Sequence, residues 1–429
     1  MCDERTAGGG ETKNTSFRGR KSLHLRTSSP PADSLPLLMK SSVNSPADTF
    51  SENLCQTLRL MADLIRDLFP FNPFDPSSMM RAFLGAMLQS VETLQSVTPE
   101  SKALIAIKEC RNKLQAFYLF QCIESVLDLA SRPNLTLSQM IEMASTLGPF
   151  FSVWATEGLG HYYTRLHARD GQFPQRLLCN ADVRDLPPQS LVPLHTGMGL
   201  ALAESALNQL TDAGTLANRF LELCRLNALP EYLSCAIEAM GLVVRNLRPD
   251  LIAQLDKEFG RRNEELQAYF WHGVGRGTYF MLVNFLPGWS APCQGYERCT
   301  DEPPHPLGRL NAASGFAWAL TLVNMREPEI VAAFLKRQQT RLAKDDAFAN
   351  GLFSALVIWL ESAPHDNSVP AFCAYNVEQS DPSLFPLWDR YVRQPAQDAL
   401  RFRGCSTKAI SDLFRYQPAT CLLRWQNDA

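Results

Sequence analysis

Small residues recur about every 38 residues through the middle of this 429-residue chain, and this repeat limits the folds that the chain can adopt. In one alignment column the successive separations are 39, 38, 38, 40 and 36 residues. The column consists of Gly160, Gly199, Ile237, Gly275, Gly315 and Gly351, and the position two residues earlier of Gly158, Gly197, Cys235, Gly273, Ala313 and Ala349. A proline follows the column after twelve or thirteen residues in the last four repeats. A glycine-marked helix followed by a helix that begins at proline is typical of stacked helical hairpins.

The small residues also predict how these helices pack. Two steps along an α-helix turn it by about 200°, so the column and the position two residues before it face nearly opposite sides. Gly197 and Ala201 form one small ridge, and Gly199 and Ala203 form the other. Glycine inside a helix costs about 1 kcal/mol, and close packing against a neighbour on each side can offset that cost. We therefore predict an all-α fold in which hairpins of about 38 residues form a solenoid or a closed α/α ring.

Two alternatives to this fold are disfavoured by the same residues. A nucleotide-binding loop of the G-x-G-x-x-G type needs a preceding strand and a third glycine, and the repeats have neither. No segment shows the alternation of apolar and polar residues that is typical of a half-buried strand.

Composition changes along the chain and divides it into four parts. Residues 1–48 are rich in Ser, Thr, Gly and Pro and contain one aromatic residue, Phe17, which predicts a disordered tail. Residues 49–148 carry apolar residues at helical spacing and predict an N-terminal helical cap. The repeat array covers residues 149–364 and includes a Pro- and Gly-rich stretch, 286–308, which predicts an irregular loop. Residues 365–429 predict a C-terminal helical cap.

Charge and targeting signals exclude several classes of protein. The net charge is −3 and no run of about 18 apolar residues is present, so we expect neither nucleic-acid binding nor a membrane span. The first residues, MCDERTAGGG, lack the apolar core of a secretory signal, which favours a cytoplasmic location in which the 12 cysteines stay reduced. The sequence indicates no cofactor.

The tail carries short motifs of its own. Ser22 and Ser29 stand near basic residues and are candidate phosphorylation sites, and the segment 26–31 resembles a motif bound by 14-3-3-type partners. A Ser/Thr-rich N-terminus also resembles the leaders of bacterial type III effectors. The alternative location is therefore a host cell, reached by type III secretion.

The inner face of the array is predicted to carry the ligand site, because its positions −3, +1 and +5 relative to the column hold ionisable residues in the first four repeats. The candidate acid and base residues are Glu157, His161, Glu238 and His272, and the candidate ligand-binding residues are Arg165, Thr196, Glu204 and Arg276. The last two repeats are apolar at these positions, with Phe316, Leu320, Phe348 and Leu352. One polar end and one apolar end suit a small molecule with a polar head and an apolar body, or a protein segment. The alternative is that these residues only decorate a solvated helix face.

A metal site is not predicted. The ligands that Glu157, His161, Glu238 and His272 would supply are spread over several repeats and match no known spacing. Cys293, Cys299 and His305 lack a fourth ligand, so a loop with unreactive thiols is the better interpretation.

Two segments of the array resemble a known family. The strings His195-Thr-Gly-Met-Gly-Leu-Ala-Leu-Ala203 and Gly273-Val-Gly-Arg-Gly-Thr-Tyr-Phe280 resemble the H-x-G-x-G-x-A-L-A and G-x-G-R-x-x-x-F segments of the helical-repeat family encoded beside enediyne polyketide synthases. The resemblance covers about residues 150–365 and leaves out the tail, the first cap and the stretch after Pro287. It implies a helical-repeat architecture and a natural-product setting, and it implies no particular reaction.

These observations leave three functions open. The first is a protein that binds a ligand or partner on its inner face, as an accessory to polyketide biosynthesis. The second is an enzyme that uses a buried Glu/His constellation on a polyketide or lipid-like substrate. The third is a secreted effector, which rests on the tail alone.

Overall fold

The computed structural model describes residues 76–168, 175–180, 183, 185–209, 212–402 and 407–418. Helices joined by turns make up these residues, no strand occurs among them, and the prediction of an all-α fold is confirmed. The expectations for the tail 1–48, including Ser22, Ser29 and the 14-3-3 motif, fall outside the described residues, as does the beginning of the first cap. All described residues belong to one unit, Ser45–Ala429.

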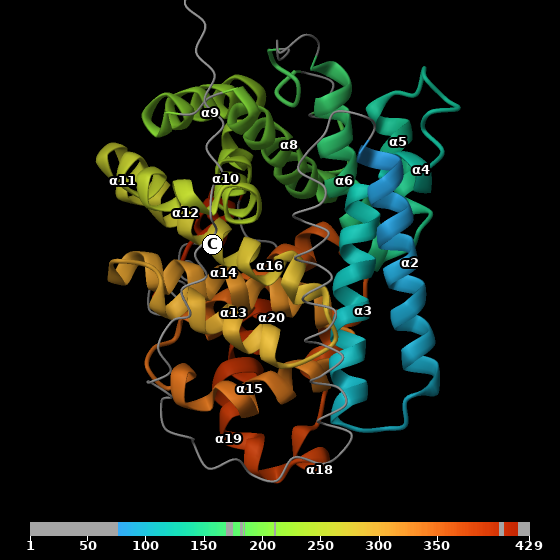
Figure 1. Ribbon diagram of the computed structural model, residues 1–429, viewed down its shortest axis with the longest axis vertical. Coiled ribbons are helices and arrows are strands. Elements are labelled where there is room, and N and C mark those ends of the chain that lie inside the picture. The colour runs from blue at the N-terminus through green and yellow to red at the C-terminus, as the bar shows by residue number, and fades with distance from the viewer. Residues whose placement is uncertain are drawn as a thin grey trace, which may run out of the picture. The chain divides into compact units, whose positions relative to one another are not determined.

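Six helices in the middle of the chain pack side by side in chain order (Figure 1). They are α6 (Pro149–His167), α8 (Pro188–Gln209), α10 (Leu233–Leu247), α12 (Glu264–Tyr279), α14 (Pro306–Asn324) and α16 (Ala347–Ser362). Each contacts the next, and α16 also contacts α8. We call these the inner helices.

The helices that alternate with them in sequence pack on the inner helices. They are α9 (Ala213–Asn227), α11 (Ile252–Arg262), α13 (Ser290–Asp301) and α15 (Pro328–Leu342). The N-terminal helices are α2 (Pro76–Val97), α3 (Lys102–Gln121), α4 (Ile123–Val126) and α5 (Leu137–Ser145), of which α3 packs on α6, α14 and α15. After α16 come α17 (Ser368–Cys373), α18 (Val377–Ser380), α19 (Phe385–Trp388), α20 (Gln394–Arg401) and a 3-10 helix, η6 (Thr407–Phe414). The described parts of both flanking regions consist of helices and turns.

The repeated glycines lie where the backbones of neighbouring inner helices meet. A Cβ atom added at Gly197 would lie 1.9 Å from the carbonyl oxygen of Glu157 in α6, and one added at Gly199 would lie 2.4 Å from that of Ala236 in α10. No real Cβ fits at such distances, so only glycine permits these two contacts. The two small ridges of α8 therefore face different neighbours, as the spacing predicts.

The other glycines of the first four repeats follow the same rule. Gly158 faces α3 and Gly160 faces α8, while Gly273 faces α10 and Gly275 faces α14. The added Cβ atom would lie between 2.0 and 2.7 Å from a backbone oxygen at each of the four positions.

The last two repeats are shifted by two residues relative to the first four. Gly315 meets the carbonyl oxygen of His272 in the preceding helix, and Gly351 meets that of Ser314. Both glycines therefore correspond to Gly197 and Gly273, which also face the preceding helix, and not to the column in which the sequence alignment sets them.

This shift overturns the expected apolar end of the inner face. The centre of the Phe316 ring lies 5.9 Å from that of Phe334 in α15 and 5.6 Å from that of Tyr296 in α13. The centre of the Phe348 ring lies 5.7 Å from that of Phe334. Phe316 and Phe348, with Leu320 and Leu352 one turn further on, therefore belong to the core between inner and outer helices. The prediction was wrong because two residues rotate a helix by about 200°, which exchanges its inner and outer faces.

The expectation of an irregular loop over 286–308 was also wrong, because α13 occupies most of this stretch. Pro292 stands in the first turn of α13, where a backbone N–H has no partner within the helix and proline costs little. The ring of Tyr296, which is 1% exposed, packs in the aromatic core beneath α13.

Replacing Gly275 by alanine tests the close helix contact. The new Cβ would lie 2.0 Å from the carbonyl oxygen of Ala312, so we expect the free energy of unfolding to fall by about 1–3 kcal/mol or more. The matched control is Gly85→Ala in α2, where the nearest atom is a ring carbon of Tyr118 at 3.9 Å. The control should gain about 0.5–1 kcal/mol, because alanine is the better helix former. Urea unfolding measures both, and equal effects would contradict the packing.

Candidate functional site

The candidate inner-face residues are buried in the structure, so the alternative of a solvated face is wrong for most of them. Glu157 is 8% exposed, His161 6% and Thr196 3%, while Glu238, His272 and Arg276 are at most 1% exposed. Glu204 is half-buried, and Arg165 is exposed near the end of α6. The hydroxyl of Thr196 donates to the carbonyl of Val192 in its own helix.

Arg276 joins three inner helices at the centre of this cluster. Its Nη1 donates to Oε2 of Glu238 in α10 at 2.6 Å, and its Nη2 donates to Oε1 of Glu157 in α6 at 3.3 Å. Because α6 and α12 are separated by two other inner helices in the row, the Arg276 side chain spans the inner face. Its guanidinium carbon also lies 4.3 Å from the centre of the Trp318 ring. We call Glu157, Glu238, His272, Arg276 and Trp318 the central cluster.

His272 has one ring nitrogen paired and one unpaired. Its Nδ1 lies 2.9 Å from Oε1 of Glu238, and the Nε2 atom is buried without a hydrogen-bond partner. A carboxylate accepts and does not donate, so the Nδ1 atom carries the proton and Nε2 presents a lone pair. The rings of Trp318 and Phe414 both lie 6.4 Å from the His272 ring.

The electrostatics of the cluster separate its titrating groups. Burial raises the pKa of Glu238, but Arg276 and His272 outweigh it and hold the pKa below its ordinary value. For Glu157 burial outweighs the nearby Arg276, and the pKa is raised. Burial lowers the pKa of His272 despite the hydrogen bond to Glu238. The result is a neutral imidazole held on a carboxylate, an arrangement that suits proton transfer.

His161 and Glu204 form a separate pair next to this cluster. Nε2 of His161 lies 2.9 Å from Oε2 of Glu204, which ties α6 to α8. The structure therefore brings Glu157, Glu238, His272 and Arg276 together and sets His161 with Glu204. The charge of Arg165 acts on Glu204 and helps to lower its pKa, and Thr196 belongs to neither group.

Trp318 and Phe414 are the residues of the site that the sequence alone does not reveal. With the last two repeats shifted by two residues, Trp318 takes the position of Arg276 and Ser314 takes that of His272. The polar stripe then continues to Asn350, which accepts a hydrogen bond of 2.9 Å from the Ser314 hydroxyl. Nothing in the spacing points to Phe414, which lies beyond the array.

Two further buried polar clusters have partners for their polar atoms and link different elements of the fold. Lys113 is buried between Glu109, at 2.8 Å, and the carbonyl of Asn284, at 2.7 Å, with the Glu109 carboxylate also accepting from Tyr279 at 2.7 Å. Asp256 accepts from Trp271 at 2.6 Å and contacts Nε2 of His305 at 3.0 Å. Because their polar atoms have partners, these clusters offer little to a ligand.

The cysteine stretch shows no sign of a metal centre. Cys299 is buried, Cys293 is half-buried, and His305 is engaged by Asp256. Among the described residues no group of three or more His, Cys, Asp or Glu side chains is arranged to hold a metal ion.

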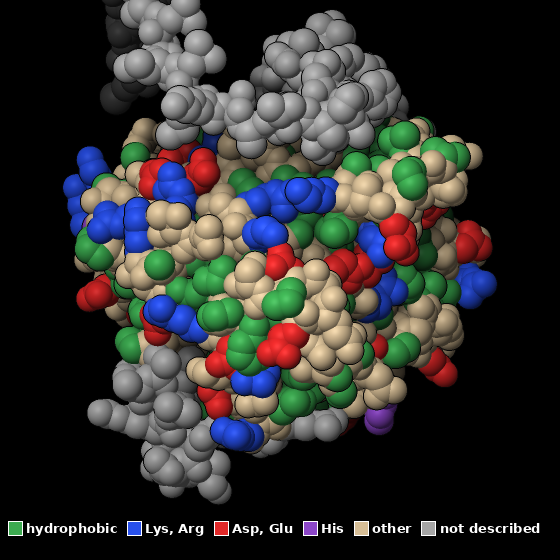
Figure 2. All heavy atoms as spheres, turned by 90° about the horizontal axis from the view of Figure 1, so that it is seen from below, with side chains coloured by type: hydrophobic (Ala, Val, Ile, Leu, Met, Phe, Trp, Pro, Cys, Tyr) green, Lys and Arg blue, Asp and Glu red, His purple; other side chains and the backbone are tan. Residues whose placement is uncertain are grey.

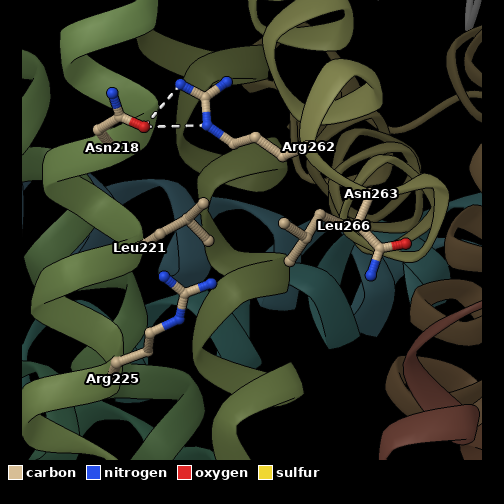
Figure 3. A pocket seen from close by; sticks show the side chains of 6 residues that line it. All are labelled: Asn218, Leu221, Arg225, Arg262, Asn263 and Leu266. Carbon is tan, nitrogen blue, oxygen red and sulfur yellow. Dashed lines mark hydrogen bonds between the residues drawn. The ribbon is translucent and has the colours of Figure 1, made fainter.

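An open groove lies away from the inner face, between α9 and the α11–α12 turn (Figure 3). It has a volume of about 420 Å³ and is lined by Asn218, Leu221, Arg225, Arg262, Asn263 and Leu266. Arg262 is hydrogen-bonded to Asn218, to which its Nη2 donates at 2.7 Å.

Figure 2 shows the face seen from below, where Lys and Arg are interspersed with Asp and Glu. Ion pairs between exposed side chains contribute little to stability.

Comparison with family models, curated proteins and solved structures finds no match to the chain. In the described part of the chain, no helix has the length and apolar character that crossing a bilayer requires. The fold and the site define an all-helical protein with a buried Glu/His/Arg/Trp cluster, and the geometry of that cluster carries the functional argument.

The buried His195 of α8 should make the free energy of unfolding depend on pH. It is fully buried, its Nδ1 lies 2.7 Å from the carbonyl of Leu191, and its Nε2 accepts from the backbone N–H of Leu229 at 3.1 Å. Burial lowers its pKa to about 4. The unfolded chain, with a pKa near 6.5, binds the proton first, so stability is complete above about pH 6.5 and is lost towards pH 4.

We expect His195→Gln to remove this dependence. The stability advantage of the wild type over the variant should shrink by about 3 kcal/mol between about pH 7.5 and pH 4. Urea unfolding at each pH measures it, with His365→Gln at an exposed position as the control. An advantage that stays constant over this range would contradict the buried, neutral state of His195.

Proposed function

We propose that the chain is a closed α/α ring of helical hairpins that binds a small, uncharged ligand at the central cluster. Support for closure comes from Trp359 of α16, whose ring lies 4.9 Å from that of Phe150 and 6.2 Å from that of Trp154, both in α6. These contacts join the last inner helix to the first. The natural-product setting implied by the family resemblance belongs to the same proposal.

Unpaired polar atoms are the observation that carries this proposal. Among the described residues, ten buried side-chain nitrogen and oxygen atoms have no hydrogen-bond partner, and five of them belong to the polar stripe at positions −3 and +1: Ser234 Oγ, His272 Nε2, Arg276 Nε, Trp318 Nε1 and Ser354 Oγ. Each such atom costs about 1–3 kcal/mol, and native cores keep few of them. Their concentration in one place favours a site that a polar ligand completes.

The charges of the cluster indicate the chemistry of the ligand. Arg276 stands between the carboxyl groups of Glu157 and Glu238, so an anion would meet the carboxyl groups and a cation would meet the guanidinium. The free donors are Arg276 Nε and Trp318 Nε1, and the free acceptor is His272 Nε2. A neutral molecule with a carbonyl and a hydroxyl or amide N–H satisfies all three. Hydroxylated polyketides have this combination of groups.

Three aromatic probes of similar size test the charge preference. We expect benzamide to bind more tightly than benzoate or benzylamine, because only the amide is neutral and supplies both an acceptor and a donor. Saturation-transfer NMR on the full chain measures the three affinities. Binding of none of them, or tightest binding of benzoate, would contradict the proposal.

Variants locate the binding. Trp318→Phe removes an unpaired donor and part of the ring that packs against Arg276, so it should weaken benzamide binding about tenfold. Trp271→Phe makes the same change in volume outside the cluster and should leave binding unchanged. Arg225→Ala alters the outer groove, and a loss of binding in that variant alone would move the ligand there.

An enzyme is the second candidate, favoured by the Glu238–His272 pair. A neutral imidazole with its Nδ1–H on a carboxylate and a free Nε2 is poised to accept a proton from a bound molecule. The unpaired Arg276 Nε and Trp318 Nε1 donors would stabilise the negative charge that develops.

The ring opening of 5-nitrobenzisoxazole tests for such a base. Nε2 of His272 would take the C3 proton while the N–O bond breaks, which gives the cyanonitrophenolate product. We expect the absorbance assay to show turnover that falls by about 100-fold in Glu238→Gln, because the carboxylate no longer stabilises the protonated ring. His365→Gln should keep the full rate. Equal rates in the two variants would leave ligand binding without catalysis.

A further inference from the structure

We infer that the described residues 407–418 form a plug over the central cluster, and that the Phe414 ring occupies the position that an aromatic or flat apolar part of the ligand takes. This inference rests on the proposed ligand site. The unpaired polar atoms indicate the polar groups of the ligand, and the plug indicates its apolar part. The plug must also leave before the ligand enters.

Phe414 is seated on the cluster itself. It is fully buried, and its ring lies 6.4 Å from that of His272 and 6.2 Å from that of Trp318. An aromatic ring against these two would make the same edge and face contacts. Because the phenyl group has no polar atoms, it satisfies neither His272 Nε2 nor Trp318 Nε1, which are both buried without a partner. A ligand with a ring and a polar substituent satisfies both requirements at once.

The plug crosses several inner helices near their N-terminal ends. The 3-10 helix η6 contacts α10 and α16. The backbone N–H of Tyr416 donates to Oδ1 of Asn311 in α14 at 2.7 Å, and Nδ2 of Asn350 in α16 donates to the carbonyl of Gln417 at 2.7 Å. A guanidinium nitrogen of Arg415 lies 3.3 Å from Glu265 in the first turn of α12. The central cluster is thus covered on the side on which the inner helices begin.

The plug buries fewer apolar side chains than each of the inner helices does. Among the plug side chains whose burial the structure describes, the buried apolar ones are Ile410, Leu413 and Phe414. A 3-10 helix has poorer hydrogen-bond geometry than an α-helix, and the entropy gained on release of the whole segment offsets much of this burial. Segments of this kind open locally without unfolding of the remaining structure.

Carbethoxylation of histidine by diethyl pyrocarbonate measures such opening. The reagent reacts with an accessible, unprotonated ring nitrogen, and the carbethoxyl group is transferred as ethyl carbonate leaves. His272 offers an unpaired Nε2 beneath the plug, whereas both nitrogens of the equally buried His195 are hydrogen-bonded within the ring of helices. In the full wild-type chain, local opening of the plug should modify His272 at least about tenfold faster than His195, as peptide mass spectrometry measures. Equal rates at the two residues would mean that only global unfolding exposes His272, which overturns the plug.

A matched pair of variants assigns the opening to Phe414. Phe414→Ala should raise the rate at His272 about tenfold over the wild type while the rate at His195 stays the same. Phe334→Ala removes an equally buried ring from the outer core, so it should raise both rates together or neither. If Phe414→Ala lowers the melting temperature sharply, Phe414→Leu serves instead, because it keeps most of the volume and loses the ring. Acceleration at His195 as well as His272 in the Phe414 variants would overturn the assignment.

The outcome is independent of whether the cluster binds a ligand. Modification of His272 reports access alone, and benzamide binding reports the site. Fast modification of His272 with no probe bound contradicts the proposed function and leaves the plug in place. Probe binding with equal modification rates at His272 and His195 contradicts the plug and leaves the site in place.

Discussion

Contact between helix backbones, made possible by glycine, is the constraint on which the rest of this structure depends. At Gly197, Gly275 and Gly315 a single added carbon would overlap a carbonyl oxygen of the neighbouring helix. Because no side chains separate the inner helices at these points, neighbouring helices stand close together. One arginine side chain, that of Arg276, can then reach carboxylates on two other helices. The polar cluster is thus a consequence of the glycine positions.

Much of the scaffold could be predicted from the sequence because its causes are local. The spacing of small residues correctly predicts that opposite sides of α8 and α12 meet different neighbours, and the absence of strand patterns predicts the all-helical fold. The two-residue shift of the last two repeats cannot be inferred from the sequence, because Gly315 aligns equally well with Gly273 or Gly275. The carbonyl that each glycine meets distinguishes the two alignments, and that contact exists only in three dimensions. For α13, the prolines and glycines indicated a loop, although a proline in the first helical turn is harmless.

The candidate site was predictable as a set of residue types and not as an arrangement. Glu157, Glu238, His272 and Arg276 follow from the stripe of ionisable residues at fixed repeat positions. Their pairing does not, because Arg276 and Glu157 are 119 residues apart and no periodicity says which carboxylate a buried arginine selects. Arg165 occupies the same stripe and is exposed, since it lies near the end of α6. Trp318 was hidden by the shift, and Phe414 belongs to a segment outside the repeats.

The ion pairs of Arg276 have a consequence for how repeats of this kind can be inherited. In an open array each unit contacts only its neighbours, so a unit can be duplicated or lost and the remaining units still stack. Here the guanidinium in the fourth repeat requires a carboxylate from the first and another from the third. A duplication or deletion between them would leave a buried charge without its partner, at a cost of about 3–5 kcal/mol. Gain or loss of a hairpin between α6 and α12 would therefore carry an electrostatic cost that a substitution elsewhere in these helices does not.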